Sequence, residues 1–223
     1  MPCFVAFDLD GVLYSAEPFL GEAYREAIAR VNQRRPESFP CVPETREILA
    51  HVGWPVPEIL NRLFPSIAAD AVDLLYHETL PVICEHVRRG EGTLFPRVGE
   101  TLEALSMDGY RLAVASNGRR PYVAAVLTTY DLQRYFVDLI AVESGSRVTK
   151  PDLLREYMKR DAIAPQQMIM VGDRTSDVEA ARDVGCAFIG CDYGHGHRDE
   201  IAGAGPIISA FGELSETIRD MGL

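Results

Sequence analysis

Two different patterns of apolar positions divide the chain. From residue 111 onward, short apolar runs alternate with segments whose apolar residues recur at helical spacing. This pattern predicts strands at 3–7, 111–115, 137–142, 168–171, 186–190 and 206–208, and helices at 121–130, 151–160, 176–184 and 212–221. Strands that alternate with helices of about ten residues are typical of βαβ units. We therefore expect a Rossmann-like parallel sheet with helices on both faces.

Residues 16–92 follow the second pattern and contain no convincing strand. Their apolar spacing, interrupted by proline-rich joints, predicts helices at 17–33, 44–51, 57–63 and 67–88. The sequence thus predicts an α/β protein with a catalytic core formed by 1–15 and 93–223 and an inserted all-α cap at 16–92. The two linkers, near 14–17 and 90–96, would act as a hinge that closes the cap over a site and excludes water.

Polar residues stand where the predicted strands end. Asp8 and Asp10 directly follow the first strand and Gly11 comes next; because Asp and Gly break strands, the strand stops where the acids begin. Three further groups follow later strands or open a helix: Ser116-Asn117-Gly118, Thr149-Lys150-Pro151, and Gly172 to Asp177. Because ligands of open α/β sheets bind at the carboxyl ends of the strands, we expect these groups to meet at one edge.

The chemistry of these side chains points to a phosphoryl group and a metal ion. Two neighbouring carboxylates repel each other unless a cation or a shared proton intervenes. A divalent metal is the simplest solution, with one carboxylate free to act as a nucleophile and the other as an acid/base. Carboxylate oxygens suit Mg²⁺, whereas a hydroxyl, an amide and a lysine suit phosphate oxygens.

In this order and spacing, the four groups resemble the motifs of the haloacid dehalogenase-like hydrolase superfamily. The first motif is Asp8-Leu9-Asp10-Gly11-Val12, the second is Ser116-Asn117, the third is Lys150-Pro151, and the fourth is Gly172-Asp173 with Asp177. The predicted insertion falls where this family has its α-helical cap. The segment from Cys191 to Ala204 is also similar to the phosphoglycolate phosphatase branch.

The resemblance implies a role for each acidic residue. Asp8 would be the nucleophile that attacks phosphorus and forms an aspartyl-phosphate. Asp10 would be the general acid/base that protonates the leaving oxygen and then activates water. Mg²⁺ would be held by the Asp8 carboxylate, the Asp10 backbone carbonyl and Asp173, with Asp177 bound directly or through water.

The resemblance also implies a phosphate-binding set. Ser116, together with Asn117 and Gly118, would bind the phosphoryl oxygens. Lys150 would neutralise charge on Asp8 and on the phosphate, and it counts with Asp8, Asp10 and Ser116 as catalytic. By contrast, we interpret the glycine-rich segment around His195 and His197 as a flexible surface loop rather than as a metal site.

Several related activities fit the sequence less well. Dehalogenases lack the second aspartate of the first motif, and phosphonoacetaldehyde hydrolases need a cap lysine, whereas residues 1–149 contain none. Phosphosugar mutases carry Thr and His soon after the first motif, where this chain has Ala16 to Leu20. We therefore expect a Mg²⁺-dependent phosphatase for small phosphomonoesters, with 2-phosphoglycolate as the first candidate substrate. The alternatives are a non-catalytic ligand-binding or regulatory protein of the same fold and a phosphosugar mutase-like enzyme.

Composition narrows the expected partners. The net charge of −11 disfavours nucleic acid and anionic membranes as partners. No uncharged apolar run approaches the ~20 residues of a membrane span. Because the first predicted strand starts by residue 3, we expect no signal peptide. Five scattered cysteines indicate reduced thiols. We expect a cytoplasmic monomer or homodimer that acts on a small phosphorylated metabolite.

Overall fold

A five-stranded parallel sheet forms the centre of the protein, whose computed structural model describes residues 4–143 and 148–222. The strand order is β4-β1-β5-β6-β7. The bounds are Phe4–Phe7 for β1, Arg111–Val114 for β4, Met168–Gly172 for β5, Ala187–Cys191 for β6 and Ile207–Ile208 for β7. The central strand β1 pairs in parallel with β4 and β5, which places the residue after each of these three strands at the same edge. The predicted α/β class with a parallel sheet is confirmed.

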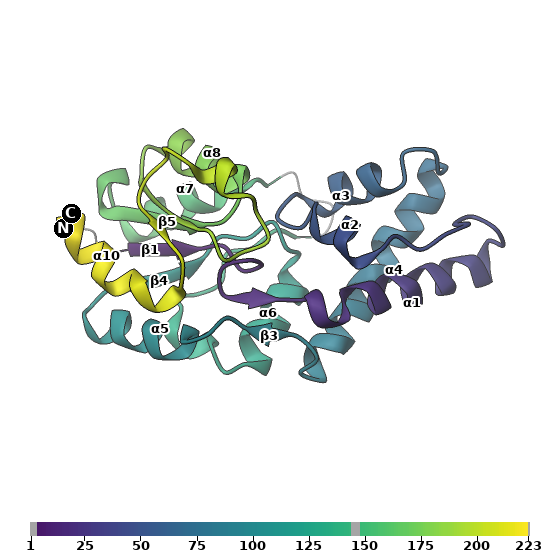
Figure 1. Cartoon of the computed structure of the whole chain (residues 1–223), viewed down its shortest axis with the longest axis horizontal. Helices are drawn as coiled ribbons and strands as arrows, with labels where there is room; N and C mark the ends of the chain where they lie inside the picture. Colours follow the sequence, from purple (N-terminus) through teal and green to yellow (C-terminus); the bar gives the residue numbers. More distant parts are fainter. Residues whose placement is uncertain (1–3, 144–147, 223) are drawn as a thin grey trace.

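The alternation of side chains along β1 supplies both layers of the core. Val5 and Phe7 face a cluster that includes residues of α5 (Val98–Met107), α6 (Arg120–Thr129) and α10 (Leu214–Asp220). Phe4 and Ala6 face a second cluster with α7 (Lys150–Asp161) and α8 (Thr175–Val184). Figure 1 shows α7 and α8 on one side of the sheet and α5 and α10 on the other. Because β1 is buried on both faces, it reads as a continuous apolar run.

A helical insertion lies between β1 and β4, at the right of Figure 1. It contains α1 (Glu17–Arg34), α2 (Thr45–Leu49), α3 (Val56–Leu63) and α4 (Ala69–Arg88). The long helices α1 and α4 pack against each other and bury apolar residues such as Ala27, Val31 and Leu75. The insertion is as expected, whereas its boundaries as a separate domain at 16 and 92 stay a prediction.

The insertion is joined to the core through a short two-stranded ribbon. Strands β2 (Tyr14–Ser15) and β3 (Thr93–Leu94) pair in an antiparallel manner at the two linkers. Two-residue strands are too short to show an alternation of apolar and polar residues, so the sequence does not predict them. Helix α5 and the short helix α9 (Arg198–Ile201) were also not among the predicted elements.

The predicted strand at 137–142 is wrong. The chain there is irregular and makes only isolated bridges, Leu112 with Phe136 just before the segment and Arg119 with Val142 at its end. Its backbone groups find other partners, since the N–H of Ile140 donates to the Tyr157 hydroxyl (2.9 Å) and the carbonyl of Val142 accepts from the N–H of Arg120 at the start of α6 (2.8 Å). Because backbone N–H and C=O groups of this apolar run find hydrogen-bond partners in this way, the run does not need to pair as a strand of the sheet.

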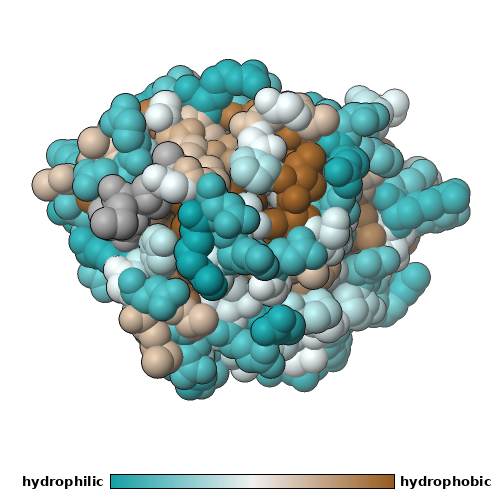
Figure 2. Space-filling model, turned by 60° about the vertical axis from the view of Figure 1, so that its left-hand side comes forward, coloured by the Kyte–Doolittle hydropathy of each residue, from teal (hydrophilic) through white to brown (hydrophobic). Residues whose placement is uncertain are grey.

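Hydrophilic and hydrophobic residues are unevenly distributed over the surface (Figure 2). Figure 2 shows a face on which hydrophilic residues predominate, while strongly hydrophobic residues lie mainly in a restricted area between them. Within the described part of the chain, no helix has the length and hydrophobicity needed to cross a bilayer. The four described cysteines, Cys41, Cys84, Cys186 and Cys191, are all free thiols, whereas Cys3 lies outside the described residues.

Candidate active site

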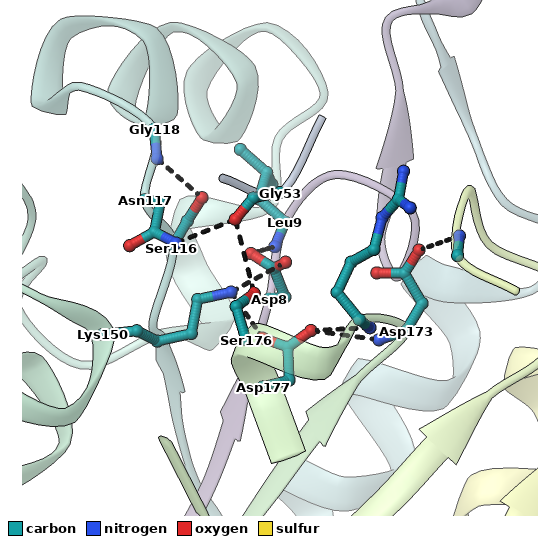
Figure 3. A network of polar contacts seen from close by, with 12 residues as sticks. Asp8, Leu9, Gly53, Ser116, Asn117, Gly118, Lys150, Asp173, Ser176 and Asp177 are labelled. Atoms are coloured by element: carbon teal, nitrogen blue, oxygen red, sulfur yellow. Dashed lines mark hydrogen bonds and ion pairs between the residues drawn. The ribbon is translucent and has the colours of Figure 1, made fainter. Parts of the chain in front are cut away.

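Three buried carboxylates meet at the carboxyl edge of the sheet. Asp8 follows β1, Asp173 follows β5, and Asp177 lies in the first turn of α8. Each side chain is at most 1 % exposed, and ligand oxygens of all three lie within 4.8 Å of one another. The edge that the sequence predicts is therefore the place where these acids meet, as Figure 3 shows.

Lys150 is the buried counter-charge of this cluster. Its Nζ lies 2.9 Å from Oδ2 of Asp8 and also pairs with Asp177. Burial works against the charge of this lysine, yet the carboxylates of Asp177 and Asp8 raise its pKa above the usual value. The local fold explains its position: Thr149 caps α7 through Asp152, and Pro151 fixes the first turn. Lys150 thus enters the site from a rigid helix start.

The acidic cluster holds more negative charge than one lysine can balance. Burial, with Asp177 and Asp8 nearby, raises the pKa of Asp173 to about 8. Burial also raises the pKa of Asp177 to about 6, although Lys150 acts in the opposite direction. Crowded, desolvated carboxylates of this kind are stabilised by a bound cation.

Asp173 has one oxygen free for such a cation. Its Oδ2 accepts hydrogen bonds from the backbone N–H groups of His195 (2.8 Å) and Gly196 (3.0 Å). Its Oδ1 is buried and has no hydrogen-bond partner among the described residues. An unpartnered carboxylate oxygen beside Asp8 and Asp177 fits a hard divalent cation with oxygen ligands. The side chain of Asp10 is not part of this cluster, so its predicted metal contact through the backbone carbonyl stays a prediction.

Asp10 lies beside the cluster and has a different environment. The hydroxyl of Tyr122 on α6 donates a 2.5 Å hydrogen bond to Oδ1 of Asp10. Burial raises the pKa of Asp10 to about 7, while the Tyr122 hydrogen bond works in the opposite direction. A carboxyl group with a pKa near neutrality is suited to proton transfer. Of the two aspartates of the first motif, Asp8 is therefore ion-paired with Lys150, whereas Asp10 can carry a proton.

The turn after β1 explains the glycine in this motif. Gly11 has φ +85°, which L side chains rarely adopt, and its N–H donates to the carbonyl of Tyr14 (2.9 Å). A Cβ at this position would lie 2.2 Å from Oδ2 of Asp173. Glycine therefore lets the first and fourth motifs approach each other.

The Ser116-Asn117-Gly118 turn follows β4 and faces the same site. The N–H of Gly118 donates to Oγ of Ser116 (3.1 Å). The side-chain amide of Asn117 instead donates to the carbonyl of Gly53 in the insertion (2.8 Å), which also accepts from Ser176 (3.4 Å). This part of the site therefore connects core and insertion (Figure 3). The predicted phosphate contacts of these three residues stay predictions.

Sequence reasoning missed several residues at this site. Tyr122 belongs to a helix that shows only apolar spacing, and nothing in the sequence signals its contact with Asp10. The segment 194–196 is not a free surface loop, because two of its N–H groups bind Asp173. A Cβ on Gly194 would lie 2.4 Å from the carbonyl oxygen of Gly11, so this glycine allows the loop to pack closely. The glycines of this segment were the signal available in the sequence. They indicate close packing against the first motif rather than a flexible surface loop.

Comparisons with known proteins agree with this geometry. The sequence profile described as haloacid dehalogenase-like hydrolase matches residues 5–191, and the chain therefore belongs to that family. It is a hydrolase of the phosphatase type, as its relatives are. It is similar to the phosphoglycolate phosphatase of Vibrio vulnificus, with 31% identity over 91% of this chain and 89% of the relative.

Solved structures show the same fold. A predicted phosphoglycolate phosphatase from Haemophilus somnus superposes with a TM-score of 0.83 and 25% identity, covering 96% of this chain and 97% of that one. CbbY from Rhodobacter sphaeroides, solved in complex with xylulose-1,5-bisphosphate, has a TM-score of 0.75 and 23% identity over 96% of each chain. The latter likeness establishes the fold alone.

Proposed function

We propose that this protein is a Mg²⁺-dependent phosphatase that hydrolyses small phosphomonoesters through an aspartyl-phosphate on Asp8. The observation that carries the proposal is the buried set of Asp8, Asp173 and Asp177 with Lys150, next to an Asp10 whose pKa is raised to about 7. Asp8 is ion-paired with Lys150, and its neighbour Asp10 can carry a proton. Transfer of a phosphoryl group to a carboxylate requires these two roles, a nucleophilic carboxylate and a neighbouring proton donor.

The proposed reaction has two displacements. An oxygen of the Asp8 carboxylate attacks phosphorus, the bond from phosphorus to the leaving oxygen breaks, and Asp10 gives its proton to that oxygen. Asp10, now a carboxylate, takes a proton from water, and this water attacks the phosphorus of the aspartyl-phosphate. The bond from phosphorus to Asp8 then breaks, which releases phosphate and restores both residues.

The remaining residues would bind and orient the phosphoryl group. Lys150 keeps the Asp8 carboxylate in place, and Ser116 would donate to a phosphoryl oxygen. Asp8, Asp173 and Asp177 are the residues that would hold Mg²⁺. When bound there, the ion would screen the negative charges of the acids and of the phosphate from each other.

The names of the relatives make 2-phosphoglycolate the first ester to test. The test measures phosphate release from 2-phosphoglycolate, sugar phosphates, nucleoside monophosphates and acetyl phosphate, with Mg²⁺ or with EDTA. We expect turnover only with Mg²⁺, and we expect Asp8→Asn to lower kcat by at least about 10³-fold. Circular dichroism and thermal melting of the variant check that it is folded.

Two results would separate the alternatives. A mutase would convert a sugar phosphate into its isomer with little free phosphate, which ³¹P NMR of the same reactions detects. A non-catalytic binding protein would release no phosphate from any ester, while a ligand would still raise its melting temperature. Turnover that persists in the folded Asp8→Asn variant would exclude the aspartyl-phosphate route.

A further inference from the structure

A pocket between the helical insertion and the sheet edge opens onto the two aspartates of the first motif. Asp8 and Asp10 line one end of it, beside the Ser116 turn. Most of its other walls are formed by the insertion and are apolar, and they include Leu20, Ile48, Val52, Trp54, Leu80 and Ile83. With a phosphoryl group at Asp8 and its leaving oxygen at Asp10, the rest of the ester extends into this pocket. The residues that line the pocket therefore select the leaving group.

Arg119 is the cationic residue of this pocket, and no other Lys, Arg or His lines it among the residues that the structure describes. It lies between the Ser116-Asn117-Gly118 turn and α6, and it is 5 % exposed. Its terminal nitrogens donate to the carbonyl of Tyr76 (2.6 Å) and to Oγ1 of Thr79 (3.0 Å) on α4. Its guanidinium carbon lies 4.4 Å from the centre of the Tyr76 ring. These partners are neutral, so they hold the side chain in place without balancing its charge.

No carboxylate balances the charge of this guanidinium either. Among residues 4–143 and 148–222, no Asp or Glu oxygen lies within 4.0 Å of its nitrogens. The side chains that act most strongly on its charge are Tyr76, Tyr24 and Cys84 rather than acids. Burial lowers the pKa of Arg119, but a guanidinium stays protonated in proteins because its ordinary pKa lies above about 12. A buried, unpaired cation is unfavourable, and an anionic ligand that reaches it would remove that cost.

Arg119 retains hydrogen-bond donors for such an anion. A guanidinium has more N–H groups than the two that donate to α4. Tyr24 on α1 also lines the pocket, and its hydroxyl stays protonated because burial raises its pKa. Arg119 lines a second pocket beside α3 and α4 as well, but Asp8 and Asp10 are not part of that lining. The first pocket is therefore the one in which a leaving group at Asp10 meets Arg119.

We propose that Arg119 recognises the leaving group of the substrate by binding a carboxylate on it, while the phosphoryl group lies at Asp8. This inference rests on the proposed function, which fixes where the leaving group lies. A carboxylate carries one negative charge and matches the planar guanidinium in shape. A second phosphoryl group carries about −1.5 to −2 charges and would bring uncompensated negative charge between apolar walls. The substrate class is therefore the phosphate ester of a small hydroxycarboxylic acid, with its carbon atoms against the apolar side chains.

The first experiment compares esters that differ mainly in the charge of the leaving group. 2-Phosphoglycolate and 3-(phosphonooxy)propanoate carry a carboxylate, and their primary amides have nearly the same shape without the charge. We expect the better of the two acids to exceed its own amide in kcat/KM by at least about tenfold, because a charge-assisted hydrogen bond is stronger than a neutral one. It should also exceed ethane-1,2-diol bisphosphate. Equal values for acids and amides, or the bisphosphate as the best ester, would overturn the inference.

Substitution of Arg119 tests whether this residue sets the preference. Arg119→Met should lower the acid-to-amide ratio of kcat/KM by at least about tenfold, mainly through a higher KM for the acid. Arg119→Lys keeps the charge, so it should restore part of the ratio, and it serves as the test if Arg119→Met does not fold. Arg120→Met is the matched control, because Arg120 is exposed, donates to the carbonyl of Leu139 (3.0 Å) and does not line the pocket. If Arg119 only joins core and insertion, all esters lose activity alike, and an unchanged ratio would contradict the proposal.

Acetyl phosphate and two phosphonates separate this inference from the proposed function. Mg²⁺-dependent hydrolysis of acetyl phosphate without a preference for acids over amides would overturn the inference alone. Binding of 3-phosphonopropionate and of its carboxamide, measured by calorimetry with the wild type and Arg119→Met, reports recognition without turnover. Tighter binding of the acid that is lost in the variant, by a protein that hydrolyses no ester, would support the inference and reject the phosphatase function. Equal binding of acid and amide by the wild type would overturn the inference.

Discussion

At the scale of single residues, the site depends on contacts that set the protonation of its acids. The Tyr122 hydroxyl stabilises the charged form of Asp10, because it donates to a carboxylate oxygen. Burial acts in the opposite direction and is the larger effect. The balance leaves the pKa of Asp10 at about 7, in the range where the group can both give and accept a proton.

Tyr122→Phe should shift the pH profile of the enzyme to higher pH. The variant loses the hydrogen bond that favours the carboxylate, so the pKa of Asp10 rises. Because the proposed first displacement needs a protonated Asp10, the basic limb of kcat/KM should move up by about 0.5–1 pH unit. A pH–rate profile of both proteins checks this. A shift to lower pH would contradict the assigned role of the tyrosine.

Gly194→Ala should weaken Mg²⁺ binding. A Cβ there would lie 2.5 Å from Oδ2 of Asp173, so either the carboxylate or the loop must move. Changes in groups that orient a metal ligand typically cost about 10–100-fold in metal affinity. Gly99→Ala is the matched control, because a Cβ at Gly99 meets nothing within 4 Å. Calorimetric titration with Mg²⁺ measures both, and equal affinities would show that the loop does not position Asp173.

At the scale of secondary-structure elements, the short helix α9 supports the start of α8. Glu200 on α9 accepts hydrogen bonds from the N–H of Thr175 (3.1 Å) and pairs with Arg174. Burial opposes its charge, but the N–H groups of His197 and Thr175 and the Arg174 guanidinium lower its pKa below the usual value. The folded state therefore holds Glu200 as a carboxylate at the N-terminus of a helix that carries Asp177.

The contribution of Glu200 to stability should depend on pH. A carboxyl group with a lowered pKa stabilises the fold above its unfolded pKa, and this stabilisation is lost as the pH falls through the folded pKa. Glu200→Gln should therefore reduce the free energy of unfolding by about 1–2 kcal/mol at pH 7 and by less at pH 3.5. Urea denaturation at both pH values measures the difference. Exposed Glu216→Gln is the control, and a loss of equal size at both pH values would contradict the electrostatic explanation.

Elements differ in how far the sequence predicts them. Buried strands such as β1 and β5 were predictable, because a continuous apolar run ends on acidic residues or glycine. The run at 137–142 has the same apolar character but no ladder, since its backbone bonds to Tyr157 and to the start of α6. The amino-acid composition of such a run does not show which hydrogen-bond partners its backbone N–H and C=O groups will have.

The candidate site also contains residues that the sequence predicts and residues that it does not. Asp8, Lys150, Asp173 and Asp177 could be placed together from motif order and strand ends, and they do meet. Tyr122 and Arg119 could not, because their roles come from contacts between segments far apart in the sequence. The apolar pocket walls were equally hidden, since each residue also reads as an ordinary core position of a helix.

At the scale of the whole molecule, we expect the buried acids to make the stability of the fold depend on a bound cation. A ligand that binds only the folded state at 100 times its dissociation constant stabilises it by about 2.7 kcal/mol. For a chain of this size, Mg²⁺ at that concentration should raise Tm by about 5–10 °C. Thermal melting with Mg²⁺ and with EDTA tests this. Asp173→Asn should abolish most of the rise, and an unchanged Tm in the wild type would argue against a metal at the cluster.

The antiparallel β2–β3 ribbon has a consequence for protein engineering. The insertion leaves and re-enters the core at two paired positions, Tyr14 with Leu94 and Ser15 with Thr93. The two ends of the insertion are therefore neighbours. A foreign helical module whose ends lie equally close could be grafted at the β2–β3 ribbon without altering the register of the sheet. Such a chimaera would keep the proposed phosphoryl-transfer residues of the core while acquiring another selectivity. Asn117, Ser176 and Arg119, which donate hydrogen bonds to the insertion, would need new partners in the foreign module.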